Sequence, residues 1–120
     1  MLKKNQVQPL ISVILPTYNH ARFLKDAIDS VIKQDYSNWE LIIIDNYSTD
    51  HTDQVISLFK DDRIKNHKIN NHGIIAKSRN KGIQESKGDW IAFLDSDDIW
   101  YLNKLSTIIN YLNRHKKIDI

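Results

Sequence analysis

The sequence predicts an α/β domain in which a mostly parallel sheet carries helices on both of its faces. Two observations favour this fold class: short apolar runs alternate with amphipathic helical segments four times, and the links between them are short. A chain of 120 residues is long enough to bury one core and too short for two domains. We therefore expect an N-terminal tail, residues 1–9, followed by one domain, residues 10–120.

The expected strands are short runs of apolar, partly β-branched residues. A continuous run such as LISVIL suits a parallel strand that is buried on both faces. Pro16 is expected to end this first strand, and the third run, RIKNHKI, is weaker and is expected nearer an edge of the sheet. The four expected strands cover residues 10–15, 39–44, 63–69 and 90–94.

Each expected strand is followed by a segment with helical periodicity. Apolar residues between positions 24 and 32, for example, recur at spacings of three and four and form one apolar face. Gly88 lies just past the third such segment, where a helix commonly ends. The expected helices cover residues 21–34, 52–60, 75–86 and 101–115. Residues 118–120 resemble the start of a further strand, so we expect the chain to be the first part of a longer protein.

The composition excludes several classes of site. The chain has no Cys, which rules out disulfides and thiolate metal ligands, and its three glycines form neither G-x-G-x-x-G nor a Walker-type loop. The net charge is +2 and the lysines are scattered, so no nucleic-acid partner is expected. No apolar run suits a signal peptide. We expect a cytoplasmic protein and leave open a peripheral contact with the inner face of a membrane.

Polar residues follow three of the expected strands. The motif Asp95, Ser96, Asp97, Asp98 follows the fourth strand, Asp45-Asn46 the second, and residues 16–19 (PTYN) the first. Because parallel strands end at one edge of the sheet, where ligands bind, these groups are expected to gather there. Crowded carboxylates repel each other unless a cation neutralises them, and ligation by oxygen alone favours Mg²⁺ or Mn²⁺. The pattern therefore predicts a divalent metal that holds a diphosphate.

Simpler roles account for some of these residues. Asp97 or Asp98 is a good candidate to cap the following helix, although a cap explains one carboxylate and not three. Asp45 is as readily a turn residue as a ligand, and Asp50 is expected to be a cap. Arg79 suits an ordinary ion pair or a contact with an anionic ligand. The five histidines include no pair at metal-binding helical spacing and are given no ligand role.

The stretches ISVILPTYNHARFLKDAIDSVIKQDYSNWELIIID, STD and GIIAKSRNKGIQESKGDWIAFLDSDD resemble the N-terminal half of a family 2 glycosyltransferase, over about residues 11–105. The resemblance implies the Rossmann-like, A-type glycosyltransferase fold. It also implies metal-dependent, inverting transfer of a sugar from a nucleotide-diphospho-sugar, with UDP expected, to a hydroxyl of a saccharide or lipid-linked acceptor. Cell-envelope or capsular polysaccharide synthesis is the expected setting.

The resemblance also implies roles for individual residues. Asp95, Ser96 and Asp97 match the D-x-D signature: Asp95 approaches the ribose, and Asp97, with Asp98, binds the metal. Arg79 matches a basic position near the base or the diphosphate. The other implied contacts are to the nucleotide, from Pro16, Thr17 and Tyr18 at its border and from Asp45 and Asn46 at the uracil or ribose.

The chain departs from the family pattern at two neighbouring positions. Asn46 stands where the family usually has a second aspartate, and Tyr47 replaces a common glycine, so base identity and the backbone conformation at Tyr47 are open. The general base of the family lies in its second half and is expected beyond Ile120. This chain is thus expected to hold the donor and metal site only, truncated before the acceptor-binding half, and to be inactive alone.

Two other classes fit parts of the sequence. A signalling receiver domain also places an Mg²⁺ site at strand ends, but it requires an acidic pair after the first strand, where residues 16–19 read PTYN. A non-catalytic, truncated nucleotide-binding remnant would expose a sheet edge and apolar surface, which favours association.

Overall fold

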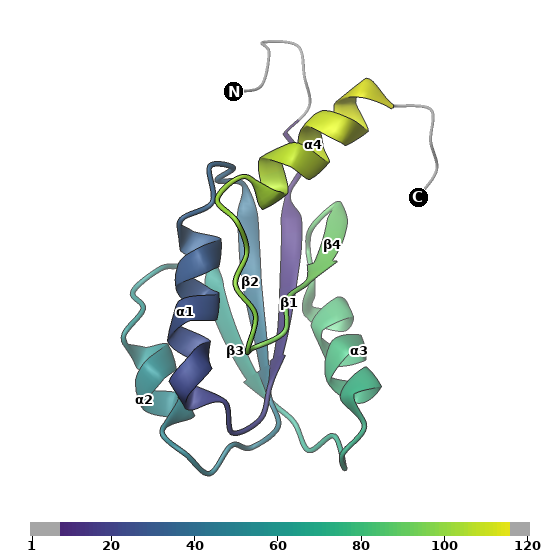
Figure 1. The fold of residues 1–120 in the computed structure, drawn as a ribbon. Helices are drawn as coiled ribbons and strands as arrows, with labels where there is room; N and C mark the ends of the chain where they lie inside the picture. The colour runs from purple at the N-terminus through teal and green to yellow at the C-terminus, as the bar shows by residue number, and fades with distance from the viewer. Residues whose placement is uncertain (1–7, 116–120) are drawn as a thin grey trace.

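Strand β1 (Ile11–Thr17) lies inside a four-stranded parallel sheet whose order is β3-β2-β1-β4. The computed structural model describes residues 8–115. The other strands are β2 (Trp39–Asp45), β3 (Ile64–Lys68) and β4 (Trp90–Phe93), each beside its neighbour in Figure 1. The predicted parallel α/β sheet is confirmed, and the weak third run does form an edge strand.

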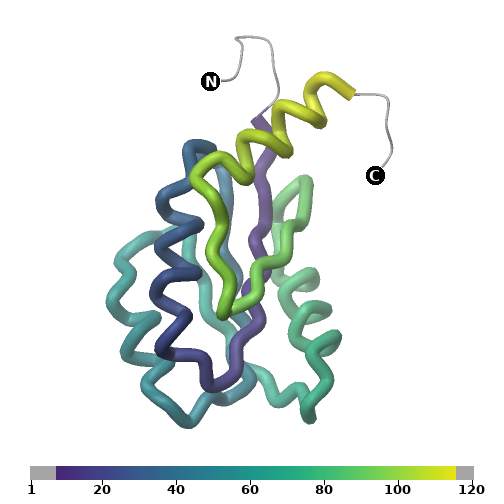
Figure 2. Tube along the Cα trace, in the orientation of Figure 1, coloured from purple at the N-terminus to yellow at the C-terminus, as the bar shows by residue number. Residues whose placement is uncertain are grey.

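Helices α1 (Ala21–Ile32), α2 (Thr52–Ser57), α3 (Ile75–Glu85) and α4 (Lys104–Arg114) alternate with the strands, as the tube in Figure 2 traces. Val13 and Leu15 belong to the core cluster that contains the apolar residues of α1 and α4. Ile14, which points to the other face because side chains alternate along a strand, meets α3. Helices therefore cover both faces, as predicted. Within residues 8–115, no helix is long and apolar enough to span a membrane.

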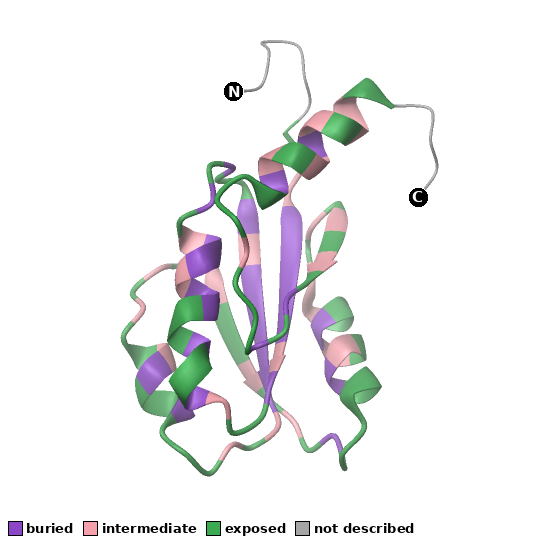
Figure 3. Cartoon of the chain, viewed as in Figure 1, coloured by how far each residue is buried: buried purple, intermediate pink, exposed green. Residues whose placement is uncertain are grey.

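The core is built on the two central strands. Residues 13–15 of β1 and 41–44 of β2 are at most 1% exposed, and Figure 3 shows the buried residues concentrated on these strands. A side chain added at Gly82 of α3 would lie 2.5 Å from Ile14 Cγ2, so this glycine lets α3 pack closely on the sheet. Burial on both faces explains why these strands read as continuous apolar runs.

Pro16 does not end the first strand, contrary to the prediction. It lies within β1 and pairs with Ile44 of β2. Strand β4 accompanies β1 only as far as Ile14, so Pro16 lies beyond the paired segment on that side. A proline without an N–H is tolerated there because no ladder hydrogen bond is lost.

The fourth helix begins at Lys104, three residues later than predicted, and the side chain of its N-cap residue, Asn103, makes no capping hydrogen bond. Neither Asp97 nor Asp98 caps it, so that prediction is wrong. The chain first runs back along the sheet beside α1 (Figure 1), and the buried Gln34 fixes this return. Gln34 Nε2 donates to Tyr101 O at 2.6 Å, and Gln34 Oε1 accepts from Leu105 N at 2.9 Å. The predicted strand at residues 118–120 lies outside the described residues.

Candidate functional site

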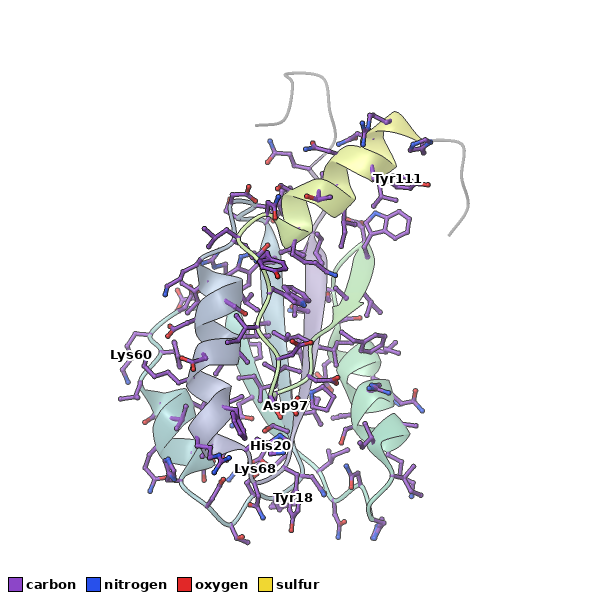
Figure 4. All side chains as sticks on the ribbon, viewed as in Figure 1. Tyr18, His20, Lys60, Lys68, Asp97 and Tyr111 are labelled. Atoms are coloured by element: carbon purple, nitrogen blue, oxygen red, sulfur yellow. The ribbon has the colours of Figure 1, made fainter. Side chains whose placement is uncertain are left out.

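A cleft of about 470 Å³ opens at the carboxyl edge of the sheet, where β1, β2 and β4 end. Figure 4 shows Tyr18, His20 and Asp97 together at this edge. The loops after all four strands contribute, as does the start of α3. The lining residues are Pro16, Thr17, Tyr18, His20, Asn46, Asn71, Gly73, Ile75, Ser78, Arg79, Asp95, Ser96 and Asp97.

Most of the residues that were predicted from the sequence to bind the donor and the metal line this cleft. Asp45 does not line it: this residue is fully buried, and its Oδ1 accepts from Ser48 N at 3.0 Å and from Ser48 Oγ at 2.6 Å. Asp98 also lies outside the lining. The residues brought together are Pro16, Thr17, Tyr18, Asn46, Arg79, Asp95, Ser96 and Asp97.

The acidic motif forms a turn at the end of β4. Asp98 N donates to Asp95 O at 3.0 Å and closes the turn, while Asp98 Oδ1 accepts from Ile99 N at 3.0 Å. Arg79 Nη2 lies 3.6 Å from Asp95 Oδ1. In residues 8–115, neither Asp97 nor Asp98 belongs to an ion pair. Their carboxylates are exposed and are not neutralised by lysine or arginine.

The donor set suits a hard cation only in part. Within the described chain, no three acidic or histidine side chains converge closely enough to hold a metal by themselves. Mg²⁺ and Mn²⁺, however, commonly bind to one or two carboxylates and complete their shell with waters and substrate phosphates. Asp97 and the free oxygen of Asp98 fit that mode, which requires a phosphate ligand.

His20 is a cleft residue that the sequence reasoning missed. Its Nδ1 lies 2.7 Å from Ser96 Oγ, and Ser96 is buried, so His20 ties the loop after β1 to the acidic turn. Its ring also packs edge-on against Phe23, with ring centroids 5.8 Å apart. The spacing of the histidines along the sequence does not signal this contact. The signal available in the sequence was the position of His20, which directly follows residues 16–19 (PTYN).

A second missed feature is a chain of amide contacts among residues that line the cleft. Asn71 N donates to Asn46 Oδ1 at 2.8 Å, and Asn71 Nδ2 donates to Ser78 Oγ at 2.9 Å. Gly73 N in turn donates to Asn71 Oδ1 at 2.8 Å. These contacts join the end of β2, the loop after β3 and helix α3. No periodicity in the sequence signals them, because the partners come from three separate elements.

Asp50 links the loops that follow β1 and β2. Its Oδ2 accepts from Ala21 N at 3.0 Å and its Oδ1 from Thr52 N at 3.1 Å, so one carboxylate serves the first turns of α1 and α2. The predicted capping role is thus present. The hydrogen bond from the Thr52 hydroxyl, and then those from the two amides, lower the pKa of Asp50 below its ordinary value.

Comparison with known proteins gives consistent matches. Residues 12–120 match the sequence model described as glycosyl transferase family 2. Over 103 residues, the chain is 42% identical to the Escherichia coli UDP-Glc:alpha-D-GlcNAc-diphosphoundecaprenol beta-1,3-glucosyltransferase WfgD, covering 86% of this chain and 41% of WfgD. Over 107 residues it is 36% identical to the putative teichuronic acid biosynthesis glycosyltransferase TuaG of Bacillus subtilis, covering 88% and 42%.

A solved structure also matches. The crystal structure of S. aureus TarS 1-349 superposes with a TM-score of 0.83 at 29% identity, covering 88% of this chain and 33% of the TarS 1-349 chain. TarS 1-349 has also been solved in complex with UDP and with UDP-GlcNAc. The chain spans about two fifths of the length of WfgD and of TuaG. The fold, the motifs and the family match agree, and the chain belongs to glycosyl transferase family 2.

Proposed function

We propose that this chain is the donor-binding part of an inverting glycosyltransferase and that it binds a nucleotide-diphospho-sugar together with Mg²⁺ or Mn²⁺. The observation that carries the proposal is that one cleft holds the amides of Asn46 and Asn71, after β2 and β3, and the carboxylate of Asp97, which follows β4 and belongs to no described ion pair. The UDP and UDP-GlcNAc complexes of TarS and the UDP-Glc donor in the name of WfgD support a UDP-linked sugar.

Asp97 and Asp98 would hold the ion, through the carboxylate oxygens that no described residue occupies. When bound, the ion supplies the positive charge that neutralises the leaving diphosphate. Arg79 and Asp95 both line the cleft, and Arg79 Nη2 lies 3.6 Å from Asp95 Oδ1. We assign Arg79 to the diphosphate, as a second positive charge, and Asp95 to the ribose. Thr17 and Tyr18, at the end of the central strand, border the nucleotide.

The acceptor side belongs to the longer protein in this proposal. The names of WfgD and TuaG point to cell-envelope polysaccharides and, for WfgD, to a lipid-linked acceptor. We assign the same class of saccharide or lipid-linked acceptor, reached at the inner face of the membrane. The general base is placed outside this chain, so donor binding, and not transfer, is the activity to test on it.

The test is calorimetric titration of the chain with UDP, with and without Mn²⁺. We expect Mn²⁺ to tighten UDP binding by about tenfold or more, which corresponds to ~1.4 kcal/mol. Asp97→Ala should remove this gain and leave the thermal unfolding midpoint unchanged. Asp62→Ala, which alters an exposed aspartate outside the cleft, is the matched control and should keep the gain.

Three results would contradict the proposal. An affinity for UDP that is the same with and without Mn²⁺ would contradict the proposed metal site. A folded wild-type chain that binds no UDP at all would instead support the non-catalytic remnant. If Asp97→Ala unfolds the chain, the acidic turn is structural and its role as a metal site fails.

A further inference from the structure

Ser96 is the buried member of the acidic turn. Its residue is 4% exposed, whereas Asp95, Asp97 and Asp98 beside it are exposed. Ser96 Oγ lies 2.7 Å from His20 Nδ1, at the length of a hydrogen bond. The turn is therefore anchored through its serine, while its carboxylates remain on the outside.

Few other contacts hold the acidic turn. The hydrogen bond from Asp98 N to Asp95 O lies within the turn, and Arg79 Nη2 is 3.6 Å from Asp95 Oδ1, longer than a hydrogen bond. Among the described residues, the contact between His20 and Ser96 is the one hydrogen bond that joins the turn to another element. Without this contact, three carboxylates that repel each other would have little to fix their directions.

His20 itself lies in a loop that is held from its other side. The amide before it, Asn19 N, donates to Ser48 Oγ at 2.9 Å, and the amide after it, Ala21 N, donates to Asp50 Oδ2 at 3.0 Å. Both acceptors belong to the loop after β2. The backbone of the β1 loop is thus fixed on one side, and its histidine side chain extends this fixed frame to the turn after β4.

We propose that His20 is a positioning residue for the metal site and acts through Ser96. By holding Ser96 inward, it keeps the carboxylates of Asp97 and Asp98 in place for the ion. The inference rests on the proposed function, which supplies the ion and the diphosphate. Ligands that are already oriented lose less conformational freedom on binding, so a residue that supports them alters metal affinity without touching the metal.

His20→Ala removes the anchor, and calorimetric titration with UDP, with and without Mn²⁺, measures the effect. In the presence of Mn²⁺, UDP binding should weaken by about tenfold, as is typical when a contact that supports metal ligands is lost. Without Mn²⁺, the affinity should stay within about twofold of the wild-type value, a difference of ~0.4 kcal/mol. His20→Asn should restore the Mn²⁺-dependent affinity, because the asparagine amide can take the place of Nδ1 as the partner of Ser96.

A double variant tests whether His20 acts through Ser96. Ser96→Ala removes the other partner of the contact, so the chain with both substitutions should bind UDP no more weakly than either single variant. Additive losses would mean that His20 contacts the ligand by itself, and they would overturn the inference.

His51→Ala is the matched control. His51 precedes α2 as His20 precedes α1, its side chain also makes no capping hydrogen bond, and it does not line the cleft. This variant should bind UDP like the wild-type chain, with and without Mn²⁺.

The remaining outcomes separate the inference from the proposed function. If His20→Ala keeps the wild-type gain from Mn²⁺, or loses affinity equally with and without Mn²⁺, the inference is overturned and the proposed function stands. A wild-type chain that shows no gain from Mn²⁺ contradicts the proposed function and the inference with it. If His20→Ala does not fold, Ser96→Ala decides, because a full gain from Mn²⁺ in that variant would also overturn the inference.

Discussion

Asp45 and Asp97 show how environment separates two carboxylates of the same edge of the sheet. Asp45 is fully buried, and its Oδ1 accepts two hydrogen bonds from Ser48, while its Oδ2 has no described partner. Asp97 is exposed in the cleft and belongs to no described ion pair. A buried carboxylate requires hydrogen bonds to be tolerated, so the contacts of Asp45 favour a role in shaping the loop after β2.

Replacing Asp45 should therefore reduce stability. We expect Asp45→Ala to lower the free energy of unfolding by about 1–3 kcal/mol, because Ser48 N and Oγ lose their acceptor. Asp45→Asn keeps an oxygen for both bonds and should have a smaller effect. Urea denaturation of the three chains measures the differences. If Asp45→Ala loses UDP binding at unchanged stability, Asp45 contacts the nucleotide, as the family resemblance implies.

The structure defines the backbone conformation at Tyr47, which was open from the sequence alone. It has a φ of 48°, in the left-handed region that glycine adopts most readily, so the replacement of the family's common glycine is accommodated in that conformation. Asn19 and His72 in the neighbouring loops also have a φ of 52°. Left-handed backbone cannot be predicted from the residue type when the residue is a tyrosine, because the surrounding turn imposes it.

At the level of elements, Asp50 couples two helices through one side chain. It accepts from Ala21 N at the start of α1 and from Thr52 N at the start of α2. A negative charge at the N-terminus of a helix is also favourable to the helix dipole. The lowered pKa of Asp50, caused first by the Thr52 hydroxyl, means that the folded state favours the ionised carboxylate.

Because folding lowers the pKa of Asp50, the stabilisation by this residue decreases at acidic pH. The pKa of Asp50 is lower in the folded chain than its ordinary pKa of 3.8. The contribution of the ionised carboxylate to stability is therefore complete above pH 3.8 and is lost as the pH falls through the folded-state pKa. Compared with Asp50→Asn, the wild-type chain should be about 1 kcal/mol more stable at neutral pH. This advantage should shrink below about pH 4.

Urea denaturation of both chains between neutral and acidic pH measures the advantage. Asp62→Asn is the control, because exposed Asp62 accepts no hydrogen bond from a described residue, and it should have little effect at any pH. An Asp50→Asn difference that stays constant down to about pH 2 would show that the charge of Asp50 does not contribute.

Much of the element order was predictable because periodicity is local. The apolar runs and the helical spacing located every strand and helix that the structure describes. The errors arose where distant contacts decide the outcome. Pro16 stays in β1 because β4 ends early, and α4 starts late because Gln34 binds Tyr101 and Leu105. The cleft followed from parallel topology, but the pairing of Asn46 with Asn71 required the folded chain.

At the scale of the whole molecule, the same topology that creates the cleft leaves the β4 edge of the described sheet without a neighbouring strand. Within residues 8–115, β4 pairs with β1 alone and has no second neighbour. Ile91 and Phe93 of β4 are 39% and 47% exposed, and their register partners Ser12 and Ile14 place them on the face of the sheet that α3 covers. Ile83 of α3 is 42% exposed. An unpaired strand edge flanked by apolar side chains favours pairing with another chain.

We therefore expect the isolated chain to self-associate as its concentration rises, and Ile91→Lys to suppress this association. A lysine on an exposed edge strand opposes strand pairing by charge and hydration. Sedimentation velocity over a range of concentrations measures the effect. Leu58→Lys, which alters a more exposed apolar residue directly after α2, is the control and should associate like the wild-type chain. Because Ile91 does not line the cleft, UDP affinity should stay unchanged, and a wild-type chain that remains monomeric would show that the β4 edge is adequately protected.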